Sequence, residues 1–436
     1  MRIAGMFMAT ALTLAGCGTS ASTDPNDNTP DVKPSTGTEV RSDKVRNTSP
    51  DVAGTTVEEL VSGNSDFAFD MYAQLKTGTG NLFYSPYSVS IALAMTYAGA
   101  ATDTLTEMAD TLHFTLPEPD LHPAFNALDL DLASRSHSPD GGEGAGLTLK
   151  IADALWGQNG YGFLVPFLDT LAVNYGAGMH LVDFSTQTEE ARLAINQWVS
   201  DQTEARIPEL LMPGTLSPLA RLVLTNAIYF KAQWAEPFVK DFTANGVFHL
   251  LSGDTVTVAM MRGEQEGPRN YTAGDGYQAV ELPYDGNETS MLVVLPDAGR
   301  FTEIESAFDA TMLARLVADL QPAELGVVLP KWSFRSKFSL KEQLTALRMP
   351  DAFVYTVADF SRMDGTRELF IGDVIHEAFV AVDEDGTEAA AATAVVMVGG
   401  SMPPPELEVN RPFLFVIRDN ITGTILFVGR VLNPAA

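Results

Sequence analysis

Hydrophobic and polar positions follow two periods along the chain, one typical of helices and the other of strands. Over residues 57–75 the apolar residues Leu60, Phe67 and Met71 recur at helical spacing, whereas shorter runs are rich in β-branched and aromatic residues. We predict helices over 57–75, 86–100, 103–112, 163–175, 188–203 and 301–319. We predict strands over 147–158, 222–230, 278–282, 290–295, 326–334, 369–382, 412–417 and 425–431.

These elements lack the regular strand–helix–strand order of a parallel sheet, and no repeat of about 20–50 residues is visible. With 436 residues, of which 45% are hydrophobic, the chain can bury a large core. The order of elements therefore predicts an α+β fold with large sheets.

The stretch 383–405 differs between its ends and its middle. It opens on the acidic Asp383-Glu-Asp-Gly386 and closes on Pro403-Pro-Pro405, both typical of exposed loops. Its middle, 387–398, reads Thr-Glu-Ala-Ala-Ala-Ala-Thr-Ala-Val-Val-Met-Val and contains no proline, so it suits a buried strand. Four consecutive alanines also favour a helix or a linker. The pattern alone leaves these alternatives open.

The net charge of the chain limits the partners that we expect. The chain has 56 acidic and 27 basic residues, a net charge of −29. Such an excess argues against nucleic acid, heparin-like polyanions and anionic membrane surfaces as partners, because all of them are negatively charged. The acidic residues are best explained as solvation of the surface.

Motifs for catalysis are missing from the sequence. The six histidines form no His-Glu-x-x-His pair, and a single cysteine provides no zinc cluster. There is no Gly-x-Ser-x-Gly and no Ser-x-x-Lys, and the glycine-rich run 141–146 lacks the Lys-Ser/Thr ending of a phosphate-binding loop. We therefore predict a protein that is not an enzyme and has no metal or cofactor.

The N-terminus has the form of an export signal. Residues 1–16 place one arginine before a short apolar run, and Leu14-Ala-Gly-Cys17 resembles the lipobox of bacterial lipoproteins. This resemblance implies a lipidated Cys17 and a protein exported to the bacterial cell envelope, at the outer membrane or cell surface; an ordinary secretory signal, giving an extracellular protein, is the alternative. Residues 17–56, rich in Ser, Thr, Asp, Asn and Pro, predict a disordered tether, which leaves 57–436 as one domain.

Several segments, in order from about residue 57 to the C-terminus, resemble the serpin family of serine protease inhibitors. They are Asn81-Leu-Phe-Tyr-Ser-Pro-Tyr-Ser88, Leu224-Thr-Asn-Ala-Ile-Tyr-Phe-Lys-Ala-Gln-Trp-Ala-Glu-Pro-Phe238, Ala358-Asp-Phe-Ser-Arg-Met363, Val409-Asn-Arg-Pro-Phe-Leu-Phe-Val-Ile-Arg418 and Phe427-Val-Gly-Arg-Val-Leu-Asn-Pro434. The resemblance implies an α+β fold with three β-sheets, eight to nine helices and an exposed reactive-centre loop at about 384–405.

The resemblance also implies a function. A serine protease cuts the loop and is trapped as an acyl-enzyme when the cut loop inserts into the central sheet, which makes the protein an irreversible suicide-substrate inhibitor. Within this frame the segment 387–398 is the strand that inserts, because one of its faces is uncharged and its alanines are thin. The alternative is a non-inhibitory binding protein of the same fold, whose loop is cleaved without trapping.

Individual residues take their roles from the resemblance. The hinge of the loop comprises Glu384, Gly386, Thr387, Glu388, Ala389, Ala390, Ala391 and Ala392. A polar cluster beneath the sheet, called the shutter in this family, comprises Ser85, Ser88, Asn226 and His376. Trp234 is expected at the breach, where insertion begins.

The reactive bond is placed by counting fifteen residues from Gly386. The count gives Gly400–Ser401, with Val398 and Met397 as alternatives for the residue before the cut. No Lys or Arg occurs between Arg367 and Arg411, so we expect an elastase-like or subtilisin-like target rather than a trypsin-like one, with a cysteine protease as a further possibility. We also expect a monomer that meets the membrane only through its lipid anchor.

Overall fold

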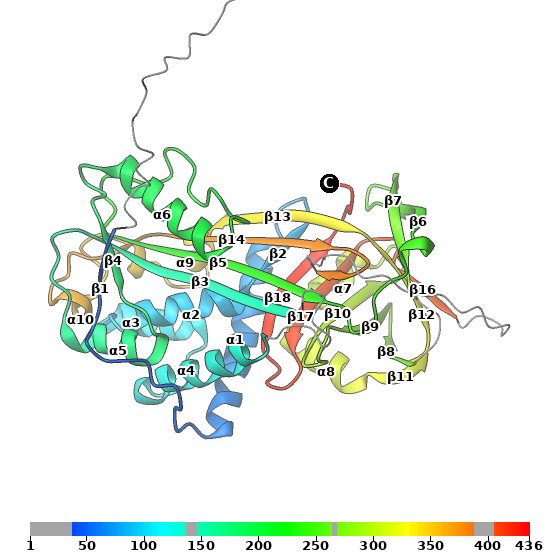
Figure 1. The fold of residues 1–436 in the computed structure, drawn as a ribbon, viewed down its shortest axis with the longest axis horizontal. Coiled ribbons are helices and arrows are strands. Elements are labelled where there is room, and N and C mark those ends of the chain that lie inside the picture. Colours follow the sequence, from blue (N-terminus) through cyan, green and yellow to red (C-terminus); the bar gives the residue numbers. More distant parts are fainter. Residues whose placement is uncertain (1–36, 137–145, 264–267, 388–404) are drawn as a thin grey trace, which may run out of the picture. The chain divides into compact units, whose positions relative to one another are not determined.

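The computed structural model describes residues 37–136, 146–263, 268–387 and 405–436. Within these ranges the chain forms ten α-helices and three β-sheets, so the predicted α+β fold with three sheets is confirmed (Figure 1). Eight of the ten helices have seven residues or more, in agreement with the eight to nine that were expected.

The largest feature is a seven-stranded sheet, here called sheet A. In spatial order its strands are β1 (Thr38–Val40), β4 (Met179–Val182), β3 (Leu147–Gln158), β5 (Leu222–Gln233), β15 (Gly386–Thr387), β14 (Ile371–Val382) and β13 (Trp332–Ser339). Strands β5 and β14 also pair directly, in parallel, from Leu222 and Ile371 through Ile228 and Ala378. The short strand β15 is therefore inserted at one end of an otherwise closed sheet.

Two further sheets adjoin the end of sheet A at which β15 enters. Sheet B contains β11 (Gln321–Glu324), β8 (Pro268–Gly274), β9 (Tyr277–Pro283), β10 (Thr289–Pro296), β17 (Phe413–Asp419), β18 (Ile425–Val431) and β2 (Leu82–Tyr84). Sheet C contains β16 (Glu406–Glu408), β12 (Gly326–Pro330), β7 (Thr255–Arg262) and β6 (Ala244–His249).

Helices cover both faces of sheet A (Figure 1). The helices of the described residues are α1 (Gly54–Leu75), α2 (Pro86–Tyr97), α3 (Thr102–Leu112), α4 (Glu118–Ser134), α5 (Val165–Tyr175), α6 (Thr188–Gln202), α7 (Phe301–Ala307), α8 (Ala310–Asp319), α9 (Lys341–Ala346) and α10 (Ser361–Asp364). The main core lies between sheet A, sheet B and helices that include α1 and α2, and a smaller core joins Trp156 of β3 to Ile195 and Val199 of α6. Short 3-10 turns occur at Lys240–Phe242 and Asp351–Phe353.

Helix α2 shows how local sequence places a functional segment. The Ser85 hydroxyl accepts a hydrogen bond from the Ser88 N–H at 3.2 Å, and Pro86 occupies the first turn, where its missing N–H costs nothing. Every residue of α2 is buried. The helix therefore passes directly beneath sheet A and brings Ser85 and Ser88 to the sheet.

Two predicted elements are each divided in the structure. The helix predicted over 301–319 is two helices, because Phe308 is extended and Asp309 caps a new helix by accepting from the Met312 N–H at 2.7 Å. The strand predicted over 326–334 is two strands in different sheets: β12 ends at Pro330, which cannot donate a ladder hydrogen bond. Lys331 therefore stands at the junction of sheets A and C. Helix α4, with prolines at 119 and 123, was not predicted.

The predicted disordered tether is wrong for residues 37–56. Strand β1 adds an antiparallel edge to sheet A, with Thr38 opposite Leu181 and Val40 opposite Met179 (Figure 1). The segment 41–53, here called the strap, then crosses α5 and α4. Arg46 donates to Asn126 Oδ1 at 2.8 Å and to Asp129 Oδ2 at 2.6 Å, while Asn126 donates to the Asn47 carbonyl. Backbone pairing and charge-assisted contacts hold this polar segment without an apolar pattern.

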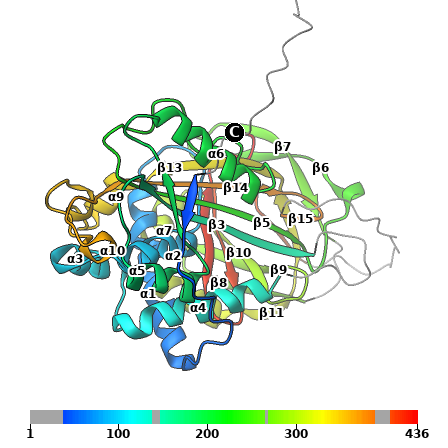
Figure 2. The same cartoon turned by 60° about the vertical axis from the view of Figure 1, so that its left-hand side comes forward.

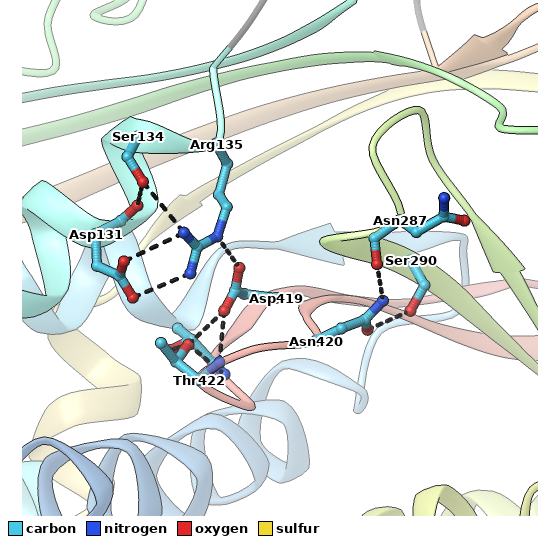
Figure 3. A network of polar contacts seen from close by, with 9 residues as sticks. Asp131, Ser134, Arg135, Asn287, Ser290, Asp419, Asn420 and Thr422 are labelled. Carbon is cyan, nitrogen blue, oxygen red and sulfur yellow. Dashed lines mark hydrogen bonds and ion pairs between the residues drawn. The ribbon is translucent and has the colours of Figure 1, made fainter. Parts of the chain in front are cut away.

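The C-terminal end of α4 is fixed to sheet B by a buried ion pair (Figure 3). Arg135 lies between Asp131, one turn earlier on the helix, and Asp419 at the end of β17, to which its Nε donates at 2.8 Å. Asp419 also accepts from the Thr422 N–H, which closes the turn between β17 and β18. Helix α4 is thus held by the strap and by sheet B.

No helix in the described part of the chain is both long and apolar enough to pass through a membrane. Residues 1–36, including the predicted signal 1–16 and Cys17, lie outside the described residues.

Candidate functional site: the entry of β15 into sheet A

The candidate site begins where β15 enters sheet A. Thr387 lies between Ala232 of β5 and Val382 of β14 and pairs antiparallel with both (Figure 2). The direct pairing of β5 with β14 reaches Ile228 and Ala378, four residues before the position of Thr387. The first residues of the predicted hinge are thus already seated between the two central strands.

Gly386 is required by this arrangement. Its φ is +157°, and a Cβ added there would lie 2.0 Å from the Ala232 carbonyl oxygen and 2.7 Å from the Gln233 Cα. Both contacts are with backbone that β-pairing holds in place, so no larger residue fits at this position. Gly386, a residue of the predicted hinge, is therefore closely packed against β5.

Thr387 is buried and contacts sheet B. It is 1% exposed, and its Oγ1 lies 2.8 Å from the Tyr284 hydroxyl, which follows β9. Burial raises the pKa of Tyr284 well above its ordinary value, despite the hydrogen bond to Thr387, so the phenol stays neutral. This contact attaches the seated hinge to the core.

Trp234, the predicted breach residue, lies beside the same opening. Its ring stacks on Tyr284 at 4.6 Å between centroids, with 6° between the ring planes. Its Nε1 donates to the Asp383 carbonyl at 3.0 Å, and its backbone N–H donates to the Asp385 carbonyl at 2.9 Å. Trp234 therefore holds the chain immediately before Gly386 and Thr387.

Glu384, the predicted hinge acid, is held by two side chains. Its carboxylate accepts from Lys331 Nζ and from the Thr243 hydroxyl, each at 2.7 Å. Burial would raise the pKa of Glu384, but these hydrogen bonds outweigh it and the pKa lies below its ordinary value. Asp385 forms a second ion pair with Lys240 at 2.8 Å. Two cations thus anchor the two acids at the start of the loop.

The four predicted shutter residues come together on β5, β14 and the start of α2. The Ser85 N–H donates to His376 Nε2 at 3.1 Å, which places the imidazole proton on Nδ1. Nδ1 in turn contacts Asn226 Oδ1, and Asn226 Nδ2 donates to Ser88 Oγ. Burial lowers the pKa of His376 to about 3, so the ring is neutral. Asn226 and His376 face each other in register across β5 and β14, where an added strand must separate them.

Sequence reasoning missed the partners of these residues. Lys331, Tyr284 and Thr243 have ordinary sequence surroundings, and only the fold brings them to the hinge. Asp153 is different: Asn226 Nδ2 donates to its Oδ1 at 2.5 Å, so it is a fifth member of the shutter. An ionisable residue in the middle of the predicted strand 147–158 was a signal that the sequence did offer.

Part of the predicted site lies outside the described residues. This applies to the hinge residues Glu388, Ala389, Ala390, Ala391 and Ala392 and to the candidate reactive-bond residues Met397, Val398, Gly400 and Ser401. Among the residues that the structure describes, no group of His, Cys, Asp and Glu side chains could hold a metal ion.

A central sheet opened at one end, with the start of a loop seated in the opening, is the architecture of proteins whose sheet accepts a strand from their own chain. Comparison with known proteins agrees. Residues 62–434 match the family model described as Serpin (serine protease inhibitor). The chain belongs to the serpin family.

Individual relatives cover nearly the whole fold. The chain is 39% identical to the leukocyte elastase inhibitor of Equus caballus over 388 residues, which are 87% of this chain and 100% of that protein. Among solved structures, the thermophilic serpin tengpin in its native state matches with a TM-score of 0.77 and 26% identity, over 90% of this chain and 97% of that chain. Thyroxine-binding globulin in complex with thyroxine matches with a TM-score of 0.76 and 30% identity, over 86% and 99% of the two chains.

Proposed function

We propose that this serpin is an irreversible, single-use inhibitor of serine proteases that traps its target by inserting the cleaved loop between β5 and β14. The observation that carries the proposal is the position of β15 at the open end of sheet A: Gly386 and Thr387 pair with β5, and Thr387 also pairs with β14. The remaining loop residues would extend a strand that has begun.

The register of β15 allows the inserted state to be worked out. Thr387 pairs with Ala232, and each later residue of an antiparallel strand would face one residue earlier on β5. Thr393 would then lie between Asn226 and His376, with its side chain on the same face of the sheet as that of Thr387. Its hydroxyl would offer a donor and an acceptor to the two shutter residues that insertion separates.

The sequence of the loop supports a long insertion. No proline occurs from Gly386 to Met402, and Glu388 carries the single charge between Thr387 and Val398. A strand of about 15 residues spans roughly 50 Å, which would carry an attached protease along most of sheet A before water could release it.

The proposed targets are proteases that accept a small or apolar residue before the cut bond. Gly400–Ser401 is the proposed bond, with Val398 and Met397 as alternatives, and no Lys or Arg lies between Arg367 and Arg411. The named relatives that inhibit leukocyte elastase support the same class of target. A protease of the subtilisin type or a cysteine protease of like preference would also fit.

The test is to incubate the full chain with elastase and, separately, with trypsin, and to analyse the products on denaturing gels. We expect an SDS-resistant complex of one inhibitor and one protease with elastase, and no such complex with trypsin. The variant Gly400→Arg should gain a complex with trypsin. Complexes of the unaltered chain with trypsin but not elastase would contradict the proposed target.

A second candidate function is that of a non-inhibitory binding protein. Thyroxine-binding globulin, a similar structure, is known in complex with thyroxine, so proteins of this fold can act by binding a small molecule. The two candidates differ in the fate of the cleaved loop: an inhibitor's loop inserts, whereas the loop of a binding protein is cut without protease being trapped.

We also propose that the chain is exported and anchored through lipid on Cys17, with a tether over 17–36, and that it acts as a monomer. The sequence Leu14-Ala-Gly-Cys17 supports the anchor. Cys17→Ala should move the protein from the membrane fraction to the soluble fraction; an unchanged distribution would remove the anchor from the account.

A further inference from the structure

Asp153 occupies an unusual place in sheet A. It lies on β3 opposite Asn226 of β5, and its Oδ1 accepts hydrogen bonds from Asn226 Nδ2 at 2.5 Å and from the Ser88 hydroxyl at 3.4 Å. The residue keeps some exposed surface, but its Oδ2 is buried and has no hydrogen-bond partner among the described residues. No ion pair within the described ranges includes this carboxyl group.

The direction of the hydrogen bonds shows what the cluster requires of Asp153. The Ser85 N–H fixes the tautomer of His376, so that His376 Nδ1 carries the proton and donates it to Asn226 Oδ1 in a hydrogen bond. The Asn226 amide nitrogen must therefore donate to acceptors, and these are Ser88 Oγ and Asp153 Oδ1. A neutral carboxylic acid satisfies this need through its carbonyl oxygen without placing a charge in the interior.

Charges near Asp153 do not favour its ionised form. From α4, Asp129 approaches it, although Arg46 of the strap pairs with Asp129 at 2.6 Å. From α2, the neutral Tyr87 lies nearby with a hydroxyl that also has no partner in the described structure. From β5 and β14 come the neutral Asn226 and His376. Burial, followed by the effect of Asp129, raises the pKa of Asp153 well above its ordinary value, against the hydrogen bonds from Asn226 and Ser88.

We propose that Asp153 is a positioning residue of the shutter: as a neutral acid it orients Asn226 and Ser88 and holds sheet A closed, and its ionisation promotes opening between β5 and β14. The proposal rests on the proposed function, because the opening of sheet A between β5 and β14 is the step that admits the loop. Asp153 acts through Asn226, to which one hydrogen bond joins it. When Asn226 separates from His376, the polar cluster that contains Asp153 is exposed to water.

The closed sheet should lose stability as pH rises. It binds the Asp153 proton more tightly than an opened or unfolded state, in which the carboxyl returns toward its ordinary pKa of about 4. The loss therefore begins above about pH 4 and continues until Asp153 ionises in the closed state as well. Because opening releases a single proton, the lifetime of the closed state changes by at most about tenfold per pH unit.

The experiment compares the intact wild-type chain with Asp153→Asn, Asp153→Glu and the control Asp110→Asn, an exposed aspartate on α3. The rate at which each protein loses its native circular dichroism is measured at one elevated temperature, from about pH 5 to about pH 9. No protease is present, so the result does not depend on whether the protein inhibits one.

We expect Asp153→Asn to live several-fold longer than the wild type at about pH 8 and to approach the wild-type lifetime near pH 5. Asp153→Glu, which can still ionise, should keep a pH dependence, and Asp110→Asn should follow the wild type. A ratio of lifetimes between Asp153→Asn and wild type that is the same at every pH would overturn the proposal. So would failure of Asp153→Asn to fold, because a neutral acceptor would then be insufficient.

Discussion

The hydroxyl of Tyr284 and Oγ1 of Thr387 lie 2.8 Å apart in the interior of the protein, and they join the start of the reactive loop to sheet B. Thr387 sits between β5 and β14, so this contact is one of those that hold the start of the loop in sheet A. On the proposed mechanism, the seating of Thr387 would be the first step of insertion.

Removing the phenol oxygen should weaken this hold. Tyr284→Phe leaves the buried Thr387 hydroxyl without its partner, at a cost of about 1 kcal/mol. We expect a small fall in the thermal midpoint and faster hydrogen exchange at Gly386 and Thr387. Tyr355→Phe, at a site that is 57% exposed, serves as the control. Equal exchange at the hinge in both variants would show that the hydroxyl does not hold it.

If the proposed inhibition is correct, Thr387→Arg should turn the protein into a substrate that is cut without trapping the protease. The side chain at 387 is 1% exposed, and an arginine there would bury an unpaired charge at the first step of insertion. We expect cleaved product and little SDS-resistant complex after incubation with elastase. Thr387→Val, which keeps the shape, should still form the complex. Retained trapping by the arginine variant would remove Thr387 from the mechanism.

Acid should loosen the anchor of the hinge at Glu384. The pKa of Glu384 is lowered in the folded protein, so its stabilising contribution is present above the ordinary carboxyl pKa and is lost as pH falls through the folded value. Glu384→Gln should remove this part of the acid dependence. It should also destabilise the protein at neutral pH by about 1 kcal/mol, a modest figure because Lys331 is 39% exposed. The check is thermal unfolding from about pH 3 to pH 7; identical acid profiles for wild type and variant would count against the anchor.

We expect Arg46 of the strap to contribute more to stability than Lys44 of the same segment. Arg46 contacts the fully buried Asn126 and the largely buried Asp129, whereas Lys44 pairs with Asp169 from a side chain that is 59% exposed. Arg46→Ala should cost about 2 kcal/mol and Lys44→Ala less than about 0.5 kcal/mol. Denaturant unfolding measures both. Similar losses of unfolding free energy in the two variants would mean that Arg46 is not a specific anchor of the strap.

Much of the fold could be predicted from periodicity. The strands 147–158 and 425–431 have the predicted bounds, and α2 begins at the predicted Pro86. The strap was missed because its contacts are backbone pairing and polar bonds to residues far along the chain, which leave no apolar pattern. The division of helix 301–319 depended on one capping residue, Asp309, and such local competition is weakly marked in sequence.

The candidate site was predictable to a different extent. The shutter residues Ser85, Ser88, Asn226 and His376 and the breach residue Trp234 were placed by family resemblance, and the structure brings the first four together and sets Trp234 beside the hinge. Lys331 and Tyr284 could not be found this way, because their roles depend on where two sheets meet. Asp153 could have been found, since a carboxylate within a buried strand needs a reason.

The most direct test of loop insertion is the thermal midpoint before and after the loop is cut. Cleavage by a protease that prefers small residues, without trapping, should free residues 388–400 to complete the strand between β5 and β14. The account predicts that the midpoint of the cut protein rises by tens of degrees, because the sheet gains a full central strand. An unchanged or lower midpoint, with the loop cut, would contradict it.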